Sequence, residues 1–341
     1  MASWNESQII NTIQSIFPTR DDLVSRGIGD DCAVIRIPHE LVTTDAAVSH
    51  VHFDLSWMHA SDAAYRCLTA NISDIAAMGG IPGPFTLALG LPQALPKRHE
   101  HRPLDNLQLE DIAGAIAALR TCIEDHGLTE CWLIGGDVVR SPELMFSITM
   151  FGRCDGHAPV MRNGARPGDA IVVLGSPGMS HIGLGLCLKG LSYTNDTRLL
   201  PFLNAFKRPL ALPYLARAIA RESLATAMMD LSDGIRTDLP RLLTQSRCGA
   251  RINIDALIPS EYMQYAAQLC QLDPVSAMLC GGEDFGLLLT CSPQHLSDIT
   301  YLAEQHHTEC RCLGTCTAGP LEWTETDTPS DRTDISFTHF G

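Results

Sequence analysis

The chain has 341 residues, of which 45% are hydrophobic, and a formal net charge of -15. This length favours two domains, and the composition is typical of a globular protein rather than a disordered one. Because nucleic-acid binding needs Lys and Arg side chains that neutralise phosphates, the acidic balance argues against a nucleic-acid partner. Apolar runs stay shorter than the roughly 18 residues of a membrane span, and the N-terminal residues lack a signal-peptide pattern. We therefore expect a cytoplasmic protein with no membrane partner.

Helices and strands are expected in mixed order along the first half of the chain. The hydrophobic pattern predicts a helix at 5–18, strands at 32–37 and 40–44, a helix at 61–78, a strand at 85–91, a helix at 109–124, and strands at 131–134 and 144–152. Ser61 is expected to cap the helix at 61–78, and Gly79-Gly80 to end it. A stretch rich in Gly, Pro and polar residues at 153–168 then suggests a boundary.

The second half is expected to continue with the same mixture. We predict a strand at 170–174, helices at 180–189, 210–221 and 237–246, a strand at 250–254, a helix at 260–269, a strand at 286–290 and a loop at 322–333. Because strands and helices do not alternate strictly, the pattern favours an α+β fold over a doubly wound sheet. The expected domains are residues 1–152 and 153–341.

Thirteen cysteines are scattered through the chain without the spacing of a disulfide framework, so we expect reduced, mostly buried thiols. One cluster contains His306, His307, Cys310, Cys312 and Cys316. Zinc sites usually pair their ligands at short gaps, with the second pair well separated, and this spacing is irregular. We interpret the segment around Cys312 as a strand that runs into a turn.

Acidic residues stand beside Gly, Ser or Thr in six separate places. These are Gly29-Asp30-Asp31, Thr43-Thr44-Asp45, Ser73-Asp74, Gly135-Gly136-Asp137, Asp230-Leu231-Ser232-Asp233-Gly234 and Gly281-Gly282-Glu283-Asp284. Any one of them alone is more typical of a turn. Several follow expected strands, where open sheets place groups that bind ligands. Carboxylates suit Mg²⁺, and glycine lets main-chain N–H groups approach an anion, so the set indicates a nucleotide phosphate held by several magnesium ions.

The usual phosphate-binding motifs are missing from the sequence. Neither the Gly-x-x-x-x-Gly-Lys-Ser/Thr loop nor the His-Arg-Asp loop of protein kinases occurs, and no Rossmann fingerprint is present. Phosphoryl transfer by this chain would therefore depend on a carboxylate-rich cradle.

Taken in order, these motifs closely resemble those of the thiamine-monophosphate kinase family, within the aminoimidazole-ribonucleotide synthetase superfamily. The resemblance also includes Val51-His52-Phe53-Asp54, the segment from Asn71 to Gly80, the segment from Arg162 to Asp169, and Phe337-Thr338-His339-Phe340. It runs over nearly the whole chain. It implies that superfamily's two-domain fold, with an N-terminal mixed sheet that dimerises and a C-terminal α+β domain.

The resemblance also implies a role for each matching residue. Mg²⁺ would be held by Asp30, Thr43, Thr44, Asp45, Asp74, Asp137, Asp230 and Asp233. ATP would contact Gly136, Asp137, Arg162 and Ser232, and thiamine monophosphate would contact His52, Glu283 and Phe337. The implied reaction is transfer of the γ-phosphoryl group of ATP to thiamine monophosphate, which gives thiamine diphosphate and ADP in a homodimeric enzyme.

No covalent nucleophile or general base is expected as a catalytic residue. A phosphate monoester has a second pKa near ~6, so the acceptor is already largely a dianion at neutral pH. Repulsion between two polyanions is then the main obstacle, and metal ions reduce it while they align the attacking and leaving oxygens. A cationic thiazolium ring would suit the aromatic face of Phe337, and Glu283 could pair with that cation or accept a hydrogen bond from the aminopyrimidine.

Some positions depart from the family pattern or allow a plainer interpretation. Val138-Val139 stand where the family has threonines, and Ile112 is the nearest candidate for an aromatic side chain that the family offers to adenine. The sequence alone is equally consistent with a half-buried structural role for His52 and with Asp284 capping a helix or turn. Two alternatives stay open: a related kinase or synthetase that acts on another phosphate, and a nucleotide-binding protein without turnover.

Overall fold

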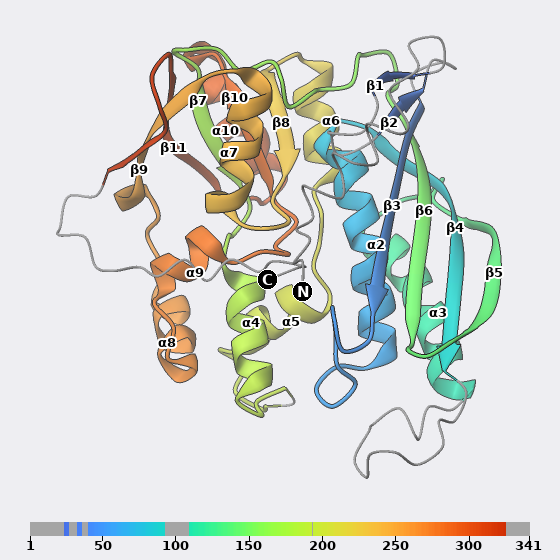
Figure 1. Cartoon of the computed structure of the whole chain (residues 1–341). Coiled ribbons are helices and arrows are strands. Elements are labelled where there is room, and N and C mark those ends of the chain that lie inside the picture. Colours follow the sequence, from blue (N-terminus) through green and yellow to red (C-terminus); the bar gives the residue numbers. More distant parts are fainter. Residues whose placement is uncertain (1–23, 27–32, 36–39, 93–108, 193, 325–341) are drawn as a thin grey trace, which may run out of the picture.

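A computed structural model describes residues 24–26, 33–35, 40–92, 109–192 and 194–324 (Figure 1). The helix expected at 5–18 and the candidate residues Asp30 and Phe337 lie outside these ranges. No helix in the described ranges is both long and apolar enough to cross a membrane. Two six-stranded sheets with helices packed on them form the molecule, which confirms the two-domain α+β architecture.

The N-terminal sheet has the strand order β1-β2-β3-β6-β4-β5. Its strands are β1 (Val24–Arg26), β2 (Ala33–Ile35), β3 (Glu40–Val48), β4 (Ile81–Pro92), β5 (Leu133–Ser141) and β6 (Met145–Arg153). Strands β4 and β5 pair in parallel and the other neighbours are antiparallel, so the expected mixed sheet is confirmed. Strand β5 begins two residues later than expected and continues to Ser141, so Gly136 and Asp137 lie within the strand rather than after it.

Helix α2 (Ala60–Ala77) packs on β3 and β6 with one face and contacts the C-terminal half with another, while α3 (Leu109–Asp125) packs beside it. Because protein surrounds α2, side chains nearly all round it are buried. The expected cap at Ser61 is wrong: His59 occupies the N-cap, without a side-chain hydrogen bond. The expected end is confirmed, since Gly79 has φ 76° and the Gly80 N–H donates to the Ile75 carbonyl at 3.0 Å.

The C-terminal sheet has the strand order β12-β9-β11-β7-β10-β8. Its strands are β7 (Ala170–Leu174), β8 (Ala225–Asp230), β9 (Gly249–Asn253), β10 (Leu287–Cys291), β11 (Cys310–Thr317) and β12 (Glu322–Thr324). Strand β7 is buried at all five positions, which explains its unbroken apolar sequence. The loop expected from residue 322 is wrong for its first three residues, because β12 pairs in parallel with β9.

Helices cover both faces of this second sheet. They are α4 (Met179–Leu188), α5 (Leu200–Lys207), α6 (Pro213–Arg221), α7 (Ile235–Ser246), α8 (Glu261–Cys270), α9 (Pro274–Cys280) and α10 (Leu296–Gln305). Alternate residues of β7 belong to two core clusters, one with α4 and α7 and the other with α6 and α10. The division between residues 152 and 153 stays a prediction; β6 ends at Arg153 and the next strand begins at Ala170.

Candidate functional site

Carboxylates from both halves of the chain line one pocket of about 520 Å³. The pocket lies where β3 and α2 meet the end of β8 and residues 281–285. It brings together Asp45, His52, Asp74, Asp230, Ser232, Asp233 and Glu283 from the set that the sequence predicts. Residues far apart in the chain therefore converge in one place, as the motif pattern indicates.

Strand β3 supplies Asp45 and Thr43 from the same face, because side chains alternate along a strand. Thr43 is buried and its hydroxyl donates a hydrogen bond to the Asp74 carboxylate. Thr44 faces the other way, where it donates to the Ile148 carbonyl at 3.0 Å and accepts from the Thr149 hydroxyl. The structure thus brings Thr43 to the carboxylate cluster and turns the Thr44 side chain away from it.

Helix α2 connects the two groups of carboxylates. Asp74 faces the pocket, and the neighbouring Ser73 hydroxyl donates to Asp230 Oδ2 at 3.0 Å. Asp230 is the last residue of β8 and is buried. The Ser73 bond therefore joins the N-terminal and C-terminal halves directly behind the pocket.

Two glycine-containing loops line the pocket at the end of β8. Gly234 has φ 91°, and a Cβ there would lie 2.8 Å from the Gly281 carbonyl oxygen. A Cβ at Gly282 would lie 2.4 Å from the Ser232 carbonyl oxygen, and the Glu283 N–H donates to that same oxygen at 2.8 Å. Glycine is needed at these positions because the two loops touch through their main chains.

Asp284 caps α4 rather than facing the pocket. Its carboxylate accepts hydrogen bonds from the Gly178 N–H at 2.6 Å and the Ser180 N–H at 2.7 Å. Burial raises the pKa of Asp284 to about 7, and the main-chain donors oppose that rise. The plainer interpretation of Asp284 is confirmed, and the cap fixes the loop that carries Glu283 against the start of α4.

Cationic groups stand beside the carboxylates at the start of α7. Arg241 donates to the Asp233 carboxylate and, at 3.0 Å, to Asp238 Oδ1. Burial and the charge of Asp233 raise the pKa of the Asp238 carboxyl to about 7, while Arg241 and Arg162 lower it. Arg162 therefore lies close enough to Asp238 for its charge to act there, although it does not line the pocket.

Gly136 and Asp137 lie apart from this pocket. They belong to β5, the edge strand of the N-terminal sheet, and β6 and β4 separate β5 from β3. Both residues are exposed, and neither lines the pocket. Within one copy of the chain, the structure does not bring these two residues to the other carboxylates.

Basic and aromatic groups also line the pocket. His52 Nδ1 accepts from the Val48 N–H at 3.2 Å, so the proton of the neutral ring lies on Nε2. Arg66 pairs with the Glu283 carboxylate and lies 4.3 Å from the Phe206 ring centroid. Arg66, Phe206 and His181 also line the pocket, and sequence reasoning missed all three. The one signal for Arg66 was that it is the only basic residue of α2.

The donor set of the pocket fits magnesium better than zinc. Its acidic groups are hard oxygen donors, and Mg²⁺ usually takes only one or two carboxylates, with phosphate oxygens and water completing the shell. Over the described part of the chain, no three His, Cys, Asp or Glu side chains are grouped so that they could hold a metal ion by themselves. The arrangement is thus suited to metal ions that arrive with a phosphate.

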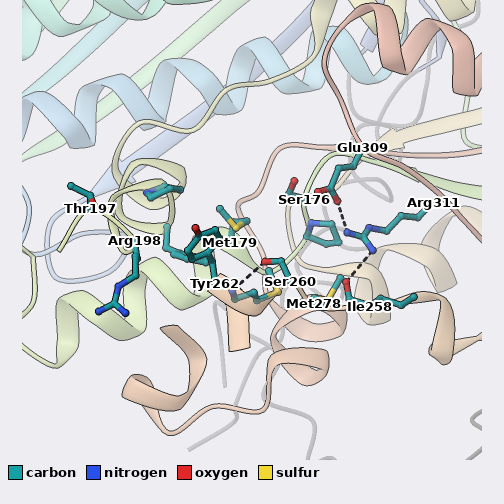
Figure 2. A pocket seen from close by; sticks show the side chains of 14 residues that line it. Ser176, Met179, Thr197, Arg198, Ile258, Ser260, Tyr262, Met278, Glu309 and Arg311 are labelled. Carbon is teal, nitrogen blue, oxygen red and sulfur yellow. Dashed lines mark hydrogen bonds and ion pairs between the residues drawn. The ribbon is translucent and has the colours of Figure 1, made fainter. Parts of the chain in front are cut away.

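A second hollow of about 380 Å³ lies between α4, α5, α8 and α9. Figure 2 shows Arg311 at one side of it, with an ion pair to Glu309 and a hydrogen bond to the Ile258 carbonyl. Much of its wall is methionine and proline, and none of the predicted site residues lines it. The carboxylate pocket is therefore the candidate functional site.

Comparison with known families covers both halves of the chain. The description "AIR synthase related protein, N-terminal domain" matches residues 29–154, and "AIR synthase related protein, C-terminal domain" matches residues 166–323. Together the two matches include every described residue that lines the carboxylate pocket.

Individual relatives agree with this assignment. The chain is 33% identical to the thiamine-monophosphate kinase of Salmonella typhimurium over 86% of this chain and 85% of that protein. A crystal structure of thiamine-monophosphate kinase from Stenotrophomonas maltophilia is 27% identical, with a TM-score of 0.73 over 92% of this chain and 95% of that one. A structure of AaThiL complexed with AMPPCP and TMP shares the fold, with 24% identity and a TM-score of 0.80 over 98% of this chain and 97% of that one. The chain belongs to the thiamine-monophosphate kinase family, within the AIR synthase related proteins.

Proposed function

We infer that the chain transfers the γ-phosphoryl group of ATP to thiamine monophosphate and forms thiamine diphosphate and ADP. The observation that carries this inference is the pocket that Asp45, Asp74, Asp230 and Asp233 line together with His52 and Glu283. The aspartates suit metal-bound phosphates, and the aromatic and basic groups of the same pocket suit an organic acceptor. Membership of the family supports the same reaction.

The chemistry needs placement more than proton transfer. At neutral pH the acceptor phosphate is already largely a dianion, so no side chain has to remove a proton from it. Bound Mg²⁺ would neutralise the phosphates and stabilise the charge of the transferring group. The chain's own contribution is to hold the carboxylates rigidly, through the Thr43–Asp74 and Ser73–Asp230 hydrogen bonds, so that donor and acceptor meet in line.

We propose that the metal ions are held by the aspartates of the pocket and the residues next to it. This set comprises Asp30, Thr43, Thr44, Asp45, Asp74, Asp137, Asp230 and Asp233. Since the Thr44 side chain faces away, its main-chain carbonyl is the group that would serve. Gly136, Arg162 and Ser232 are the proposed ATP contacts, and His52, Glu283 and Phe337 the proposed contacts of thiamine monophosphate.

We further propose a homodimer that forms through the N-terminal sheet. Strand β5 exposes Trp132 nearby and Ile134, Val138 and Val139 within it, with 59%, 61%, 65% and 41% of their surfaces accessible. An edge strand that is apolar on both faces is a strong candidate for pairing with a second copy. Such pairing would also allow Gly136 and Asp137 of one copy to approach the carboxylate pocket of the other copy. Val138→Glu should yield a monomer by light scattering; an unchanged mass, or a monomeric wild type, would refute the proposal.

One assay tests the reaction. Purified protein with Mg-ATP and thiamine monophosphate should form thiamine diphosphate and ADP in equal amounts, and EDTA should abolish both. ATP binding without product would instead favour a nucleotide-binding protein that lacks turnover, and turnover with another phosphate alone would favour a related kinase. The cysteines of the described ranges are free thiols, which supports our proposal that the protein is cytoplasmic.

A further inference from the structure

The Arg66–Glu283 ion pair joins α2 to the loop after α9, and both residues line the same pocket as the carboxylates. Arg66 and Asp74 face the pocket from the same side of α2, two turns and about 12 Å apart. A helical side chain leans toward the N-terminus of its helix, so the Arg66 guanidinium points further from Asp74. If the acceptor phosphate lies beside Asp74, the pyrimidine ring of thiamine monophosphate reaches the ion pair.

The ion pair is close to neutral as a unit. Glu283 is therefore already compensated by Arg66 and is poorly suited to act as a counter-ion for the thiazolium ring. Its remaining capacity is as a hydrogen-bond acceptor, because an ionised carboxylate has several lone pairs and Arg66 occupies only one oxygen in this contact. This removes one of the two roles that the sequence left open for Glu283.

Arg66 has one hydrogen-bond donor group without an acceptor. Its side chain is only 7% exposed, and its buried Nη1 has no hydrogen-bond partner, while Nη2 binds Glu283. A buried N–H group without a partner is costly, so an acceptor atom brought by a substrate would be favourable there. The Phe206 ring centroid lies 4.3 Å from the guanidinium carbon, and the Trp57 and Phe206 ring centroids lie 5.6 Å apart, so these rings pack beside the guanidinium and limit its movement.

We propose that Arg66 and Glu283 together read the amino-substituted edge of the pyrimidine. Glu283 accepts a hydrogen bond from the exocyclic amino group, and Arg66 Nη1 donates one to the ring nitrogen beside it. Among the described residues that line the pocket, Arg66 is the one Lys or Arg side chain, so it is the natural donor for this nitrogen. Arg66 is thus a specificity-determining residue, an inference that rests on the proposed function.

Two substrates and one substitution test this assignment. The analogue is thiamine monophosphate with C–H in place of the ring nitrogen next to the amino-bearing carbon. The wild type should favour the natural substrate by about tenfold or more in kcat/KM, which corresponds to one hydrogen bond from a charged donor. Arg66→Met keeps the length of the stem and removes the donor, so the two substrates should become equal within about twofold.

The ratio of kcat/KM for the two substrates distinguishes recognition of the ring nitrogen by Arg66 from a purely structural role. If Arg66 only holds Glu283 in place, Arg66→Met lowers kcat/KM for both substrates alike and leaves the preference intact, which overturns the proposal. Equal use of both substrates by the wild type overturns it as well. A wild type that does not phosphorylate thiamine monophosphate at all instead refutes the proposed function.

Two further variants complete the design. Arg208→Met is the matched control, because Arg208 also pairs with an acid, Asp62, at 3.0 Å and faces an aromatic ring, that of Tyr65, but does not line the pocket. It should keep the wild-type preference. Arg66→Lys serves if Arg66→Met does not fold: one ammonium group cannot reproduce the fork, so the preference should again fall below about threefold. A preserved tenfold preference in Arg66→Lys would contradict the assignment.

Discussion

Gly234 lies beside the pocket and has a main-chain conformation that favours glycine. Its φ is 91°, and a Cβ added there would meet the Gly281 carbonyl oxygen at 2.8 Å, which leaves no space for alanine. Gly234→Ala should therefore lower the free energy of unfolding by more than about 1 kcal/mol in urea titrations, and it should reduce activity because Asp233 precedes it.

Gly114 provides the opposite case for the same substitution. It lies within α3, and no atom comes within 4 Å of a Cβ placed there. Gly114→Ala should stabilise the protein by about 0.5–1 kcal/mol, since alanine favours a helix over glycine. A loss of stability in both variants would contradict the local explanation.

Removing the charge of Asp45 should abolish catalysis without unfolding the protein. Asp45 lies on β3 at the edge of the pocket, and Asp45→Asn keeps its shape. We expect kcat to fall by at least about a hundredfold, because a hard anionic donor for the metal-bound phosphates is lost. The thermal midpoint should stay within a few degrees.

Asp111→Asn, on the exposed surface of α3, is the control for this change and should leave kcat unaltered. A near-normal rate in Asp45→Asn would argue against a metal role for this residue.

Single residues of the site differ in how far the sequence could identify them. Asp45, Asp74, Asp230 and Asp233 stand in short motifs that indicated a shared site, and the structure places all four around one pocket. Arg66 has no motif: its partner Glu283 is 217 residues away, and only folding brings the two together. Thr44 shows a third case, since the alternation of β3 sets its side chain on the other face of the sheet.

At the scale of elements, the cap on α4 links stability to the site. Asp284→Ala leaves the Gly178 and Ser180 N–H groups without their acceptor, so it should cost about 1–3 kcal/mol in urea titrations. Because Glu283 is the preceding residue, the variant should also raise KM for thiamine monophosphate several-fold.

Asp273→Ala is a matched control, since Asp273 caps α9 by accepting from the Ser276 N–H at 2.7 Å. It should cost about 1 kcal/mol and leave KM unchanged. If both variants had the same KM as the wild type, the link between the α4 cap and the substrate loop would be lost.

Helices and strands were predictable from sequence where one burial pattern runs through the whole element. Strand β7 is buried on both faces, so its apolar run gave the observed bounds, Ala170–Leu174. Strand β5 was harder, because glycine and aspartate at its centre are typical of a turn, yet pairing with β4 holds them in the strand. Helices α5, α9 and α10 were missed; α9 has only seven residues, which gives little periodicity to detect.

At the scale of the whole molecule, His126 makes stability depend on pH. It lies just after α3, where Nδ1 donates to the Cys122 carbonyl at 2.7 Å and Nε2 accepts from the Ala211 N–H at 3.0 Å. Burial lowers the pKa of His126 below its usual value of 6.5. The unfolded chain therefore binds a proton near pH 6.5 that the folded chain binds only at lower pH, so stability falls as pH drops through that range.

His126→Gln should flatten this part of the curve. Thermal midpoints between pH 5 and 7.5 should change less with pH in the variant than in the wild type, with the difference bounded by about 1.4 kcal/mol per pH unit. His306→Gln, on an exposed position, should keep the wild-type slope. Parallel curves for wild type and His126→Gln would show that His126 is not the group responsible.

The joining of the two halves was beyond the reach of sequence patterns. Ser73 belongs to a motif that suggested a ligand, yet its hydroxyl binds Asp230 and connects α2 to β8. His126 likewise has no motif and connects α3 to the segment before α6. Contacts between the halves depend on how the two folded surfaces pack, and local hydrophobic periodicity does not predict that packing.

Helix α2 carries Asp74, proposed to hold a metal ion, and Arg66, proposed to contact the pyrimidine ring, and a helix is nearly incompressible along its axis. The distance of about 12 Å between Arg66 and Asp74 along the helix axis is thus fixed by eight residues of helix rather than by flexible loops. A molecule with a shorter distance between its ring and its phosphate would contact Arg66 or the metal ion at Asp74, but not both. Adding a single residue between these positions would rotate Arg66 by about 100° around the helix relative to Asp74, so the two side chains would no longer face the same pocket.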